Sequence, residues 1–138
     1  MKIVYYINTI TIRFAGRLKM SKSCIGFEMD DAQKALEHMK YEKITDYGDN
    51  AYGHSLHTWD DGKRILVKCK NCGGYILIQD SEYHSFGDSG DSYYTDYFPV
   101  DSEEQADELN RKYDGITIER EFPTRYLCVT NRRIHWSK

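Results

Sequence analysis

The sequence of 138 residues predicts a single α+β domain over residues 1–138, with an antiparallel sheet of roughly five to seven strands and two short helices. Three observations predict this fold class. Several short runs are rich in branched apolar and aromatic residues, and turn residues separate them. Two segments begin with helix-capping residues, and neither a repeat nor a low-complexity linker divides the chain.

The first elements are expected to be two strands, or one long bent strand, at Lys2–Ile7 and Ile10–Ala15. The first segment is almost entirely apolar, and the second alternates apolar and polar residues, which is typical of a strand. Asp30 then signals the start of a helix that runs to about Lys40, with Gln33 as its capping-box partner.

The middle of the chain predicts a loop followed by three strands. Glycines and polar residues mark the loop at Tyr47–Gly53, and His54–Trp59 reads as a strand that ends in a turn at Asp60–Gly62. The branched residues of Arg64–Lys68 and Tyr75–Gln79 predict two further strands, joined as a hairpin.

A second helix and two strands are expected in the last third of the chain. Ser102 begins the helix with Gln105 as its capping partner, and Asp114–Gly115 ends it. The segments Ile116–Glu121 and Arg125–Thr130 follow as strands, because both are rich in branched and aromatic residues.

Charge is distributed in blocks that the net charge of −3 conceals. The segment Asp80–Asn110 contains ten acids and no lysine or arginine, yet it also contains six aromatic rings. One interpretation is a solvated loop, but such loops are usually poor in aromatics. The other is a docking surface that resembles a phosphate backbone and occupies a basic nucleic-acid-binding groove. Its expected contacts are Asp88, Asp91, Tyr93, Tyr94, Asp96, Tyr97, Glu103 and Glu104.

Cys69 and Cys72 have the spacing of half a zinc site, and glycines follow them at the predicted tip of a hairpin. The alternatives are two reduced thiols with no cofactor, or a structural zinc that pins the hairpin. Zinc needs two more ligands, and the sequence leaves their identity open. The expected partners are His54, which would lie at the same end as Cys69, or Cys128 or His135, with Cys24 and His84 as further options.

A zinc-ribbon-like nucleic-acid-binding module is the alternative function. Basic residues near the cysteine pair and the C-terminus would contact phosphates. The sequence pI of about 5.9 argues against it, although a basic face can coexist with an acidic one and hold a guide RNA. Its contacts would be Lys63, Arg64, Lys68, Lys70, Arg132 and Arg133.

Enzymatic activity is not expected, because no nucleophile elbow, phosphate-binding loop or dinucleotide fingerprint is present. The third reading, a small nuclease or hydrolase, would need His54, His57 or His84 to cluster in space. Cys128 lies inside a predicted strand, where a small buried core residue is the ordinary explanation.

The segments Lys68–Gln79, Tyr93–Val100 and Ser102–Gly115 resemble small proteins encoded in phages and mobile elements of Gram-positive bacteria. The resemblance covers the second half of the chain. It implies an inhibitor of host defence of the anti-CRISPR type, whose partner would be a CRISPR effector nuclease. The start of the chain shows neither a targeting signal nor a run of the ~20 apolar residues that a membrane helix needs, so the cytoplasm of a bacterial host is the expected location.

Overall fold

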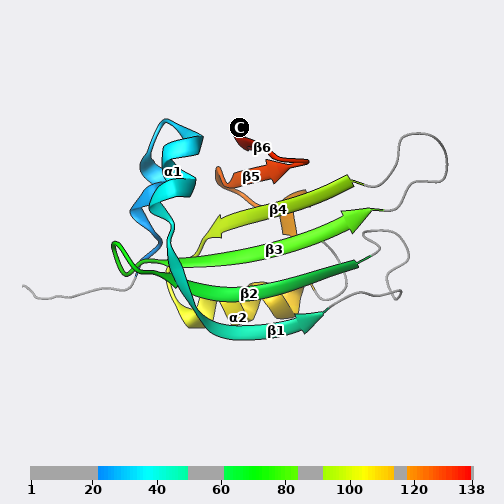
Figure 1. Cartoon of the computed structure of the whole chain (residues 1–138). Coiled ribbons are helices and arrows are strands. Elements are labelled where there is room, and N and C mark those ends of the chain that lie inside the picture. The colour runs from blue at the N-terminus through cyan, green and yellow to red at the C-terminus, as the bar shows by residue number, and fades with distance from the viewer. Residues whose placement is uncertain (1–21, 50–60, 84–91, 114–117, 138) are drawn as a thin grey trace, which may run out of the picture.

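The computed structural model describes residues 22–49, 61–83, 92–113 and 118–137. Within these ranges the protein is α+β, as the sequence predicts, with one antiparallel sheet in the order β1-β2-β3-β4-β5-β6 (Figure 1). The strands are β1 (Tyr41–Asp49), β2 (Asp61–Cys69), β3 (Tyr75–Tyr83), β4 (Ser92–Pro99), β5 (Leu127–Thr130) and β6 (Arg133–Trp136). The helices are α1 (Ala32–His38) and α2 (Glu103–Lys112), and two short 3-10 helices are η1 (Ile25–Glu28) and η2 (Ile118–Arg120).

Each strand pairs with its neighbour in sequence, so the sheet is a meander. Directly paired residues of antiparallel strands point to the same face of the sheet. One face therefore contacts η1 and α1, and the opposite face contacts α2 and η2 (Figure 1). We call them the α1 face and the α2 face.

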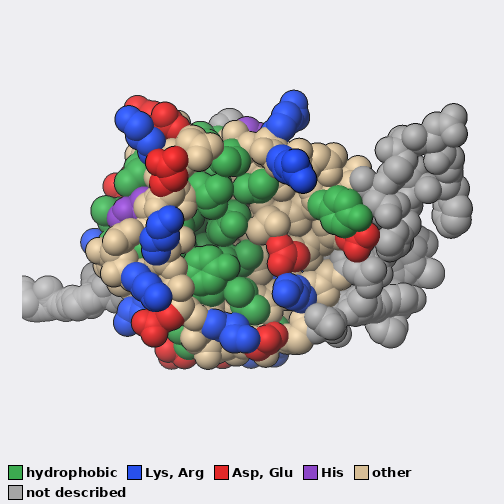
Figure 2. Space-filling view, in the orientation of Figure 1, with side chains coloured by type: hydrophobic (Ala, Val, Ile, Leu, Met, Phe, Trp, Pro, Cys, Tyr) green, Lys and Arg blue, Asp and Glu red, His purple; other side chains and the backbone are tan. Residues whose placement is uncertain are grey.

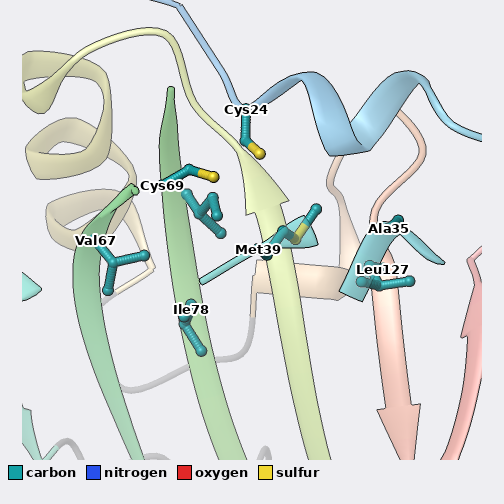
Figure 3. Packing of buried hydrophobic residues seen from close by; sticks show 8 residues of the cluster. Cys24, Ala35, Met39, Val67, Cys69, Ile78 and Leu127 are labelled. Atoms are coloured by element: carbon teal, nitrogen blue, oxygen red, sulfur yellow. The ribbon is translucent and has the colours of Figure 1, made fainter. Parts of the chain in front are cut away.

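The core on the α1 face is built from strand residues and the small residues of the first helix. Figure 3 shows several of its side chains converging, with the sulfur atoms of Cys24 and Cys69 at one end. The fully buried members are Cys24, Ala35, Met39, Val67, Cys69, Ile76, Ile78 and Leu127. Figure 2 looks onto this face, where apolar side chains fill the centre and charged side chains surround them.

The core on the α2 face contains larger side chains and more aromatic rings than the core on the α1 face. The ring of Phe98 lies 4.8 Å from the rings of both Phe122 and Tyr126, at tilted angles that favour ring contact. Its buried members are Leu66, Leu77, Phe98, Val100, Ala106, Tyr113, Ile118 and Phe122.

The two helices differ in how well the sequence predicts their starts. The oxygen of Ser102 accepts a hydrogen bond from the backbone N–H of Gln105 at 3.1 Å, which confirms the predicted cap of α2. The cap of α1 is Asp31 rather than Asp30, and it accepts from the N–H of Lys34 at 3.1 Å. Gln33 is not a capping partner, because its side chain donates to Glu37.

Other differences concern strands with weak local patterns. The segment from Tyr41 is strand β1 where a loop was expected from Tyr47, and strand β6 was not anticipated. The predicted strand Ile116–Glu121 is instead the 3-10 helix η2 in its described part, because Ile118 turns into the α2-face core. The acidic block is also not a loop throughout, since strand β4 lies within it. The expected strands at Lys2–Ile7, Ile10–Ala15 and His54–Trp59 lie outside the described residues.

Candidate metal centre

Four potential metal ligands meet at the end of the sheet where β2 turns into β3. The ligand atoms of Cys24, His38, Cys69 and Cys72 all lie within 4.8 Å of one another. Cys24 caps η1, His38 is the last residue of α1, Cys69 is the last residue of β2, and Cys72 lies in the turn that follows. The group therefore joins three segments that are far apart in the sequence.

The segment before η1 is held against the start of β3 by backbone hydrogen bonds. The N–H of Cys24 donates to the carbonyl of Tyr75 at 3.2 Å, and the N–H of Tyr75 donates to Lys22 at 3.0 Å. Gly74 makes this approach possible, because a Cβ at that position would lie 2.5 Å from the backbone of Cys24. Gly74 is thus required for packing, whereas Gly73 before it takes the positive φ of 77° in the turn.

The end of α1 is tied to the same turn by further polar contacts. The side-chain amide of Asn71 donates to the carbonyl of His38 at 2.7 Å, and the N–H of Lys70 donates to the carbonyl of Lys40 at 2.6 Å. The C-terminus of α1 leaves carbonyl groups without helical partners, and the turn satisfies one of them. These contacts place the His38 ring beside the cysteines.

Cys72 and Cys24 differ in how readily their thiols ionise. Burial opposes ionisation of Cys72, but the nearby His38 ring and two backbone N–H groups outweigh it, and the pKa of Cys72 falls to about 6. Burial raises the pKa of Cys24 well above its ordinary value. The Sγ atoms of the two residues are only 3.5 Å apart, so one ionised thiol favours a neutral neighbour. A divalent cation would reverse this balance and ionise both thiols.

One nitrogen atom of the His38 ring lacks a hydrogen-bond partner among the described residues. The Nε2 atom of His38 is buried and has no hydrogen-bond partner within the described part of the chain. A buried imidazole nitrogen without a partner costs free energy, and imidazole is a common metal ligand. Three thiols and one imidazole are a common ligand set for a closed tetrahedral site, so the residues present fit a metal ion of this kind.

The sequence identified half of this group. Cys69 and Cys72 do belong to it, but Cys69 ends a strand and only Cys72 stands in the turn. Cys24 was a further option, and His38 was missed because nothing in its local sequence distinguishes it from any helical histidine. Only the docking of α1 brings it to the cysteines.

The other predicted ligands do not reach the pair. Cys128 and His135 are paired with each other across β5 and β6 and lie on the α2 face, whereas Cys69 belongs to the α1-face core. The sheet itself separates them, which corrects their assignment as ligands. His54 and His84 lie outside the described residues.

The predicted docking surface of the acidic block is only partly exposed. Asp96 is buried on the α2 face, so it cannot imitate an exposed phosphate. Tyr94 and Tyr97 are half-buried, while Tyr93 is exposed. Glu103 and Glu104 are exposed in the first turn of α2, and Asp88 and Asp91 lie outside the described residues.

The predicted basic contacts do not form one surface. Arg64 is buried, with its guanidinium donating to Gln79 at 2.9 Å and to the Asn110 side chain at 3.1 Å. Lys63 and Lys68 are exposed but lie on opposite faces, because they are five positions apart along a regular strand whose side chains alternate. The remaining members, Lys70, Arg132 and Arg133, are exposed in the turn after β2 and at the β5–β6 turn.

A second polar cluster crosses the α2 face as a row of directly paired residues. Burial and the neighbouring Glu119 raise the pKa of Asp96 to about 7. Burial and Asp96 raise the pKa of Cys128 to about 12, which keeps it a neutral thiol and a poor nucleophile. The row consists of Arg64, Gln79, Asp96, Cys128 and His135.

Comparison with known proteins adds no assignment. No family model matches the sequence, and no curated protein or solved structure matches it. Among the helices of the described residues, none has the length and apolar character of a membrane span. The functional reading therefore depends on the geometry of the chain itself.

Proposed function

We propose that the protein is a binding protein stabilised by one structural zinc ion, held by Cys24, His38, Cys69 and Cys72. The observation that carries this proposal is the convergence of four ligand atoms within 4.8 Å, one of which is the ring of a histidine whose buried Nε2 lacks a partner. Four protein ligands fill a tetrahedral site and leave no position for a substrate, as in structural rather than catalytic zinc sites. The zinc fastens η1 and α1 to the sheet.

Metal analysis of the purified protein tests this proposal. The wild type should contain about one zinc per chain, the ratio of a single four-ligand site. The Cys72→Ser variant should lose most of the metal, whereas Cys128→Ser is the matched control because it removes a thiol outside the group. Cobalt substitution should give thiolate-to-cobalt charge-transfer bands and tetrahedral ligand-field bands in the wild type and the control. Equal zinc content in all three proteins would refute the ligand assignment.

We also propose that the partner is a basic, nucleic-acid-binding protein of a host defence system, of the CRISPR effector type. The supporting observation is the surface of α2, where Asp101, Glu103, Glu104, Asp107 and Glu108 are all exposed. None of these five acids forms an ion pair with another described residue. The helix dipole accounts for acids in the first turn, but Asp107 and Glu108 lie beyond it. Such a surface suits a partner that normally binds phosphates.

An inhibition assay with a charge-reversed variant tests the second proposal. The protein is titrated into a target-DNA cleavage reaction with a guide-loaded effector from a Gram-positive host, and binding to free DNA and RNA is measured in parallel. The wild type should inhibit cleavage without binding free nucleic acid, and inhibition should weaken with salt. The Glu103→Lys/Glu104→Lys variant should lose inhibition, while Glu28→Lys, an exposed reversal on η1, should retain it. Unchanged inhibition by the double variant would exclude this surface.

A further inference from the structure

The metal centre contains one thiol that solvent reaches and two that it does not. Cys72 is exposed in the turn after β2, whereas Cys24 and Cys69 are 1% and 2% exposed. The sulfur of Cys72 donates to the sulfur of Cys24 at 3.5 Å, whereas the sulfur of Cys69 donates to the carbonyl of His38 at 3.6 Å. An oxidant that enters from solvent therefore meets Cys72 first and finds Cys24 beside it.

We propose that Cys72 and Cys24 form an oxidation site, in which a peroxide converts the two thiols to a disulfide. The metal-releasing consequence rests on the zinc proposed above, but the disulfide itself does not. Such a site would make the metal centre responsive to oxidants rather than permanently structural.

The chemistry balances in two steps. The Cys72 thiolate attacks one oxygen of hydrogen peroxide, the O–O bond breaks, and Cys72 becomes a sulfenic acid with release of hydroxide. The Cys24 sulfur then attacks the sulfenic sulfur, the S–S bond forms, and the sulfenic hydroxyl leaves with the Cys24 proton as water. The two sulfurs are oxidised by two electrons in total, and these electrons reduce the peroxide. A zinc ion held by the four residues would keep only His38 and Cys69 as ligands and would be released.

A disulfide between Cys24 and Cys72 would link two separate segments of the protein. Cys24 and Cys72 are 48 residues apart in sequence, and they belong to the segment before η1 and to the β2–β3 turn. A disulfide between them would keep these two segments joined after the metal has left, because the cross-link restricts the unfolded chain. The sulfurs must approach from 3.5 Å to about 2.05 Å, a short movement for an exposed turn residue.

Peptide mapping after peroxide treatment tests this inference on the full-length, zinc-loaded protein. The protein is titrated with hydrogen peroxide, alkylated, digested without reduction and analysed by mass spectrometry, while a chromogenic indicator follows released zinc. The expected product is a peptide pair linked through Cys24 and Cys72, with one zinc released per link, and reductant with added zinc should restore the starting state. Cys128→Ser should behave as the wild type, and Cys24→Ser should leave Cys72 as a sulfenic or sulfinic acid.

The outcomes separate this inference from the proposed function. A Cys69–Cys72 link as the main product, or overoxidation of Cys72 in the wild type without a link, would overturn the oxidation site and leave the zinc assignment standing. A Cys24–Cys72 link in a protein that is purified without zinc would support the oxidation site and refute the structural zinc.

Discussion

The two faces of the sheet are each covered by one helix, but different interactions hold the two helices in place. Helix α2 has ten residues, its predicted cap is present, and its inner residues pack on the large rings and branched side chains of the α2 face. Helix α1 has seven residues, and Ala35 is its buried member. Helices this short are marginal without tertiary support. Ala35 packs in the α1-face core, and the zinc proposed above would add a second support at the end of α1.

Buried polar groups show the same difference. On the α2 face, Arg64, Gln79 and Glu119 are linked by hydrogen bonds of 2.9 and 3.3 Å between side chains, so the protein satisfies these groups itself. On the α1 face the Nε2 atom of His38 has no such partner among the described residues. The hydroxyl of Ser81 on the α2 face is also buried without a partner in the described part of the chain, but only the His38 ring lies beside three thiols that could share a metal ion with it.

Removal of the metal should have the largest effect, because it should destabilise the α1 face and not the α2 face. A strong chelator should destabilise the protein by on the order of 5 kcal/mol or more, since structural zinc sites bind with larger free energies than this. In hydrogen exchange, the amides of Ala35 and Met39 in and after α1 should lose protection before those of β3 and β4. The same chelator should have no further effect on Cys72→Ser. Retained protection of α1 in the metal-free protein would show that apolar packing alone is sufficient.

Truncation of the central ring on the α2 face should have the next largest effect. Phe98 is fully buried between Phe122 and Tyr126, so Phe98→Ala should cost about 3–5 kcal/mol in urea unfolding. Tyr93→Ala, at an exposed position of the same strand, should cost about 0.5 kcal/mol or less. The zinc content of folded Phe98→Ala should equal that of the wild type. A loss of zinc would mean that the two faces are coupled through the sheet.

The buried acid of the α2 face should make stability depend on pH. The pKa of Asp96 in the folded protein is about 7, above its unfolded value of about 3.9, so the folded state holds a proton that the unfolded state releases. This group's contribution therefore falls as pH rises from about 4 to about 7 and is constant above that range. Asp96→Asn removes the dependence and should be more stable than the wild type at pH 8, by on the order of 4 kcal/mol.

The measurement is the difference in unfolding free energy between the two proteins from pH 6 to pH 8, at saturating zinc so that the metal centre does not contribute. The difference should grow up to about pH 7 and then level off. A difference that stays constant over this interval would mean that Asp96 is already ionised in the folded protein.

Substitutions of the adjacent glycines Gly73 and Gly74 should have the smallest effects, and they test how the segment at Cys24 packs against the β2–β3 turn. Gly74→Ala should cost about 1–3 kcal/mol and weaken zinc binding, because its Cβ would meet the backbone of Cys24 at 2.5 Å. Gly73→Ala should cost about 1–2 kcal/mol from its φ of 77° alone, with zinc binding preserved, since a Cβ there would touch only the Lys68 side chain, at 4.0 Å. Unfolding and zinc competition titrations distinguish the two. Equal zinc affinity in both variants would mean that the segment at Cys24 is not pressed against the turn.

Local sequence patterns were sufficient to predict the helices and strands that short-range interactions define. The cap at Ser102, the branched residues of β2 and β3, and the segment around Leu127 predicted their elements, because capping and period-two apolar patterns act within a few residues. Strand β1 was missed because it is an edge strand with two irregularities in its pairing and an exposed, polar sequence. Such a strand is held by its neighbour rather than by its own apolar pattern.

The candidate site divides in the same way. The sequence by itself determined the Cys69–Cys72 pair and the glycines after it, since a turn sets their spacing. Only the tertiary structure decided that Cys24 and His38 complete the group, that Asp96 and Arg64 are buried, and that Cys128 faces away. The physical reason is that strand register and helix docking bring together residues up to 48 positions apart, and no local propensity encodes that distance.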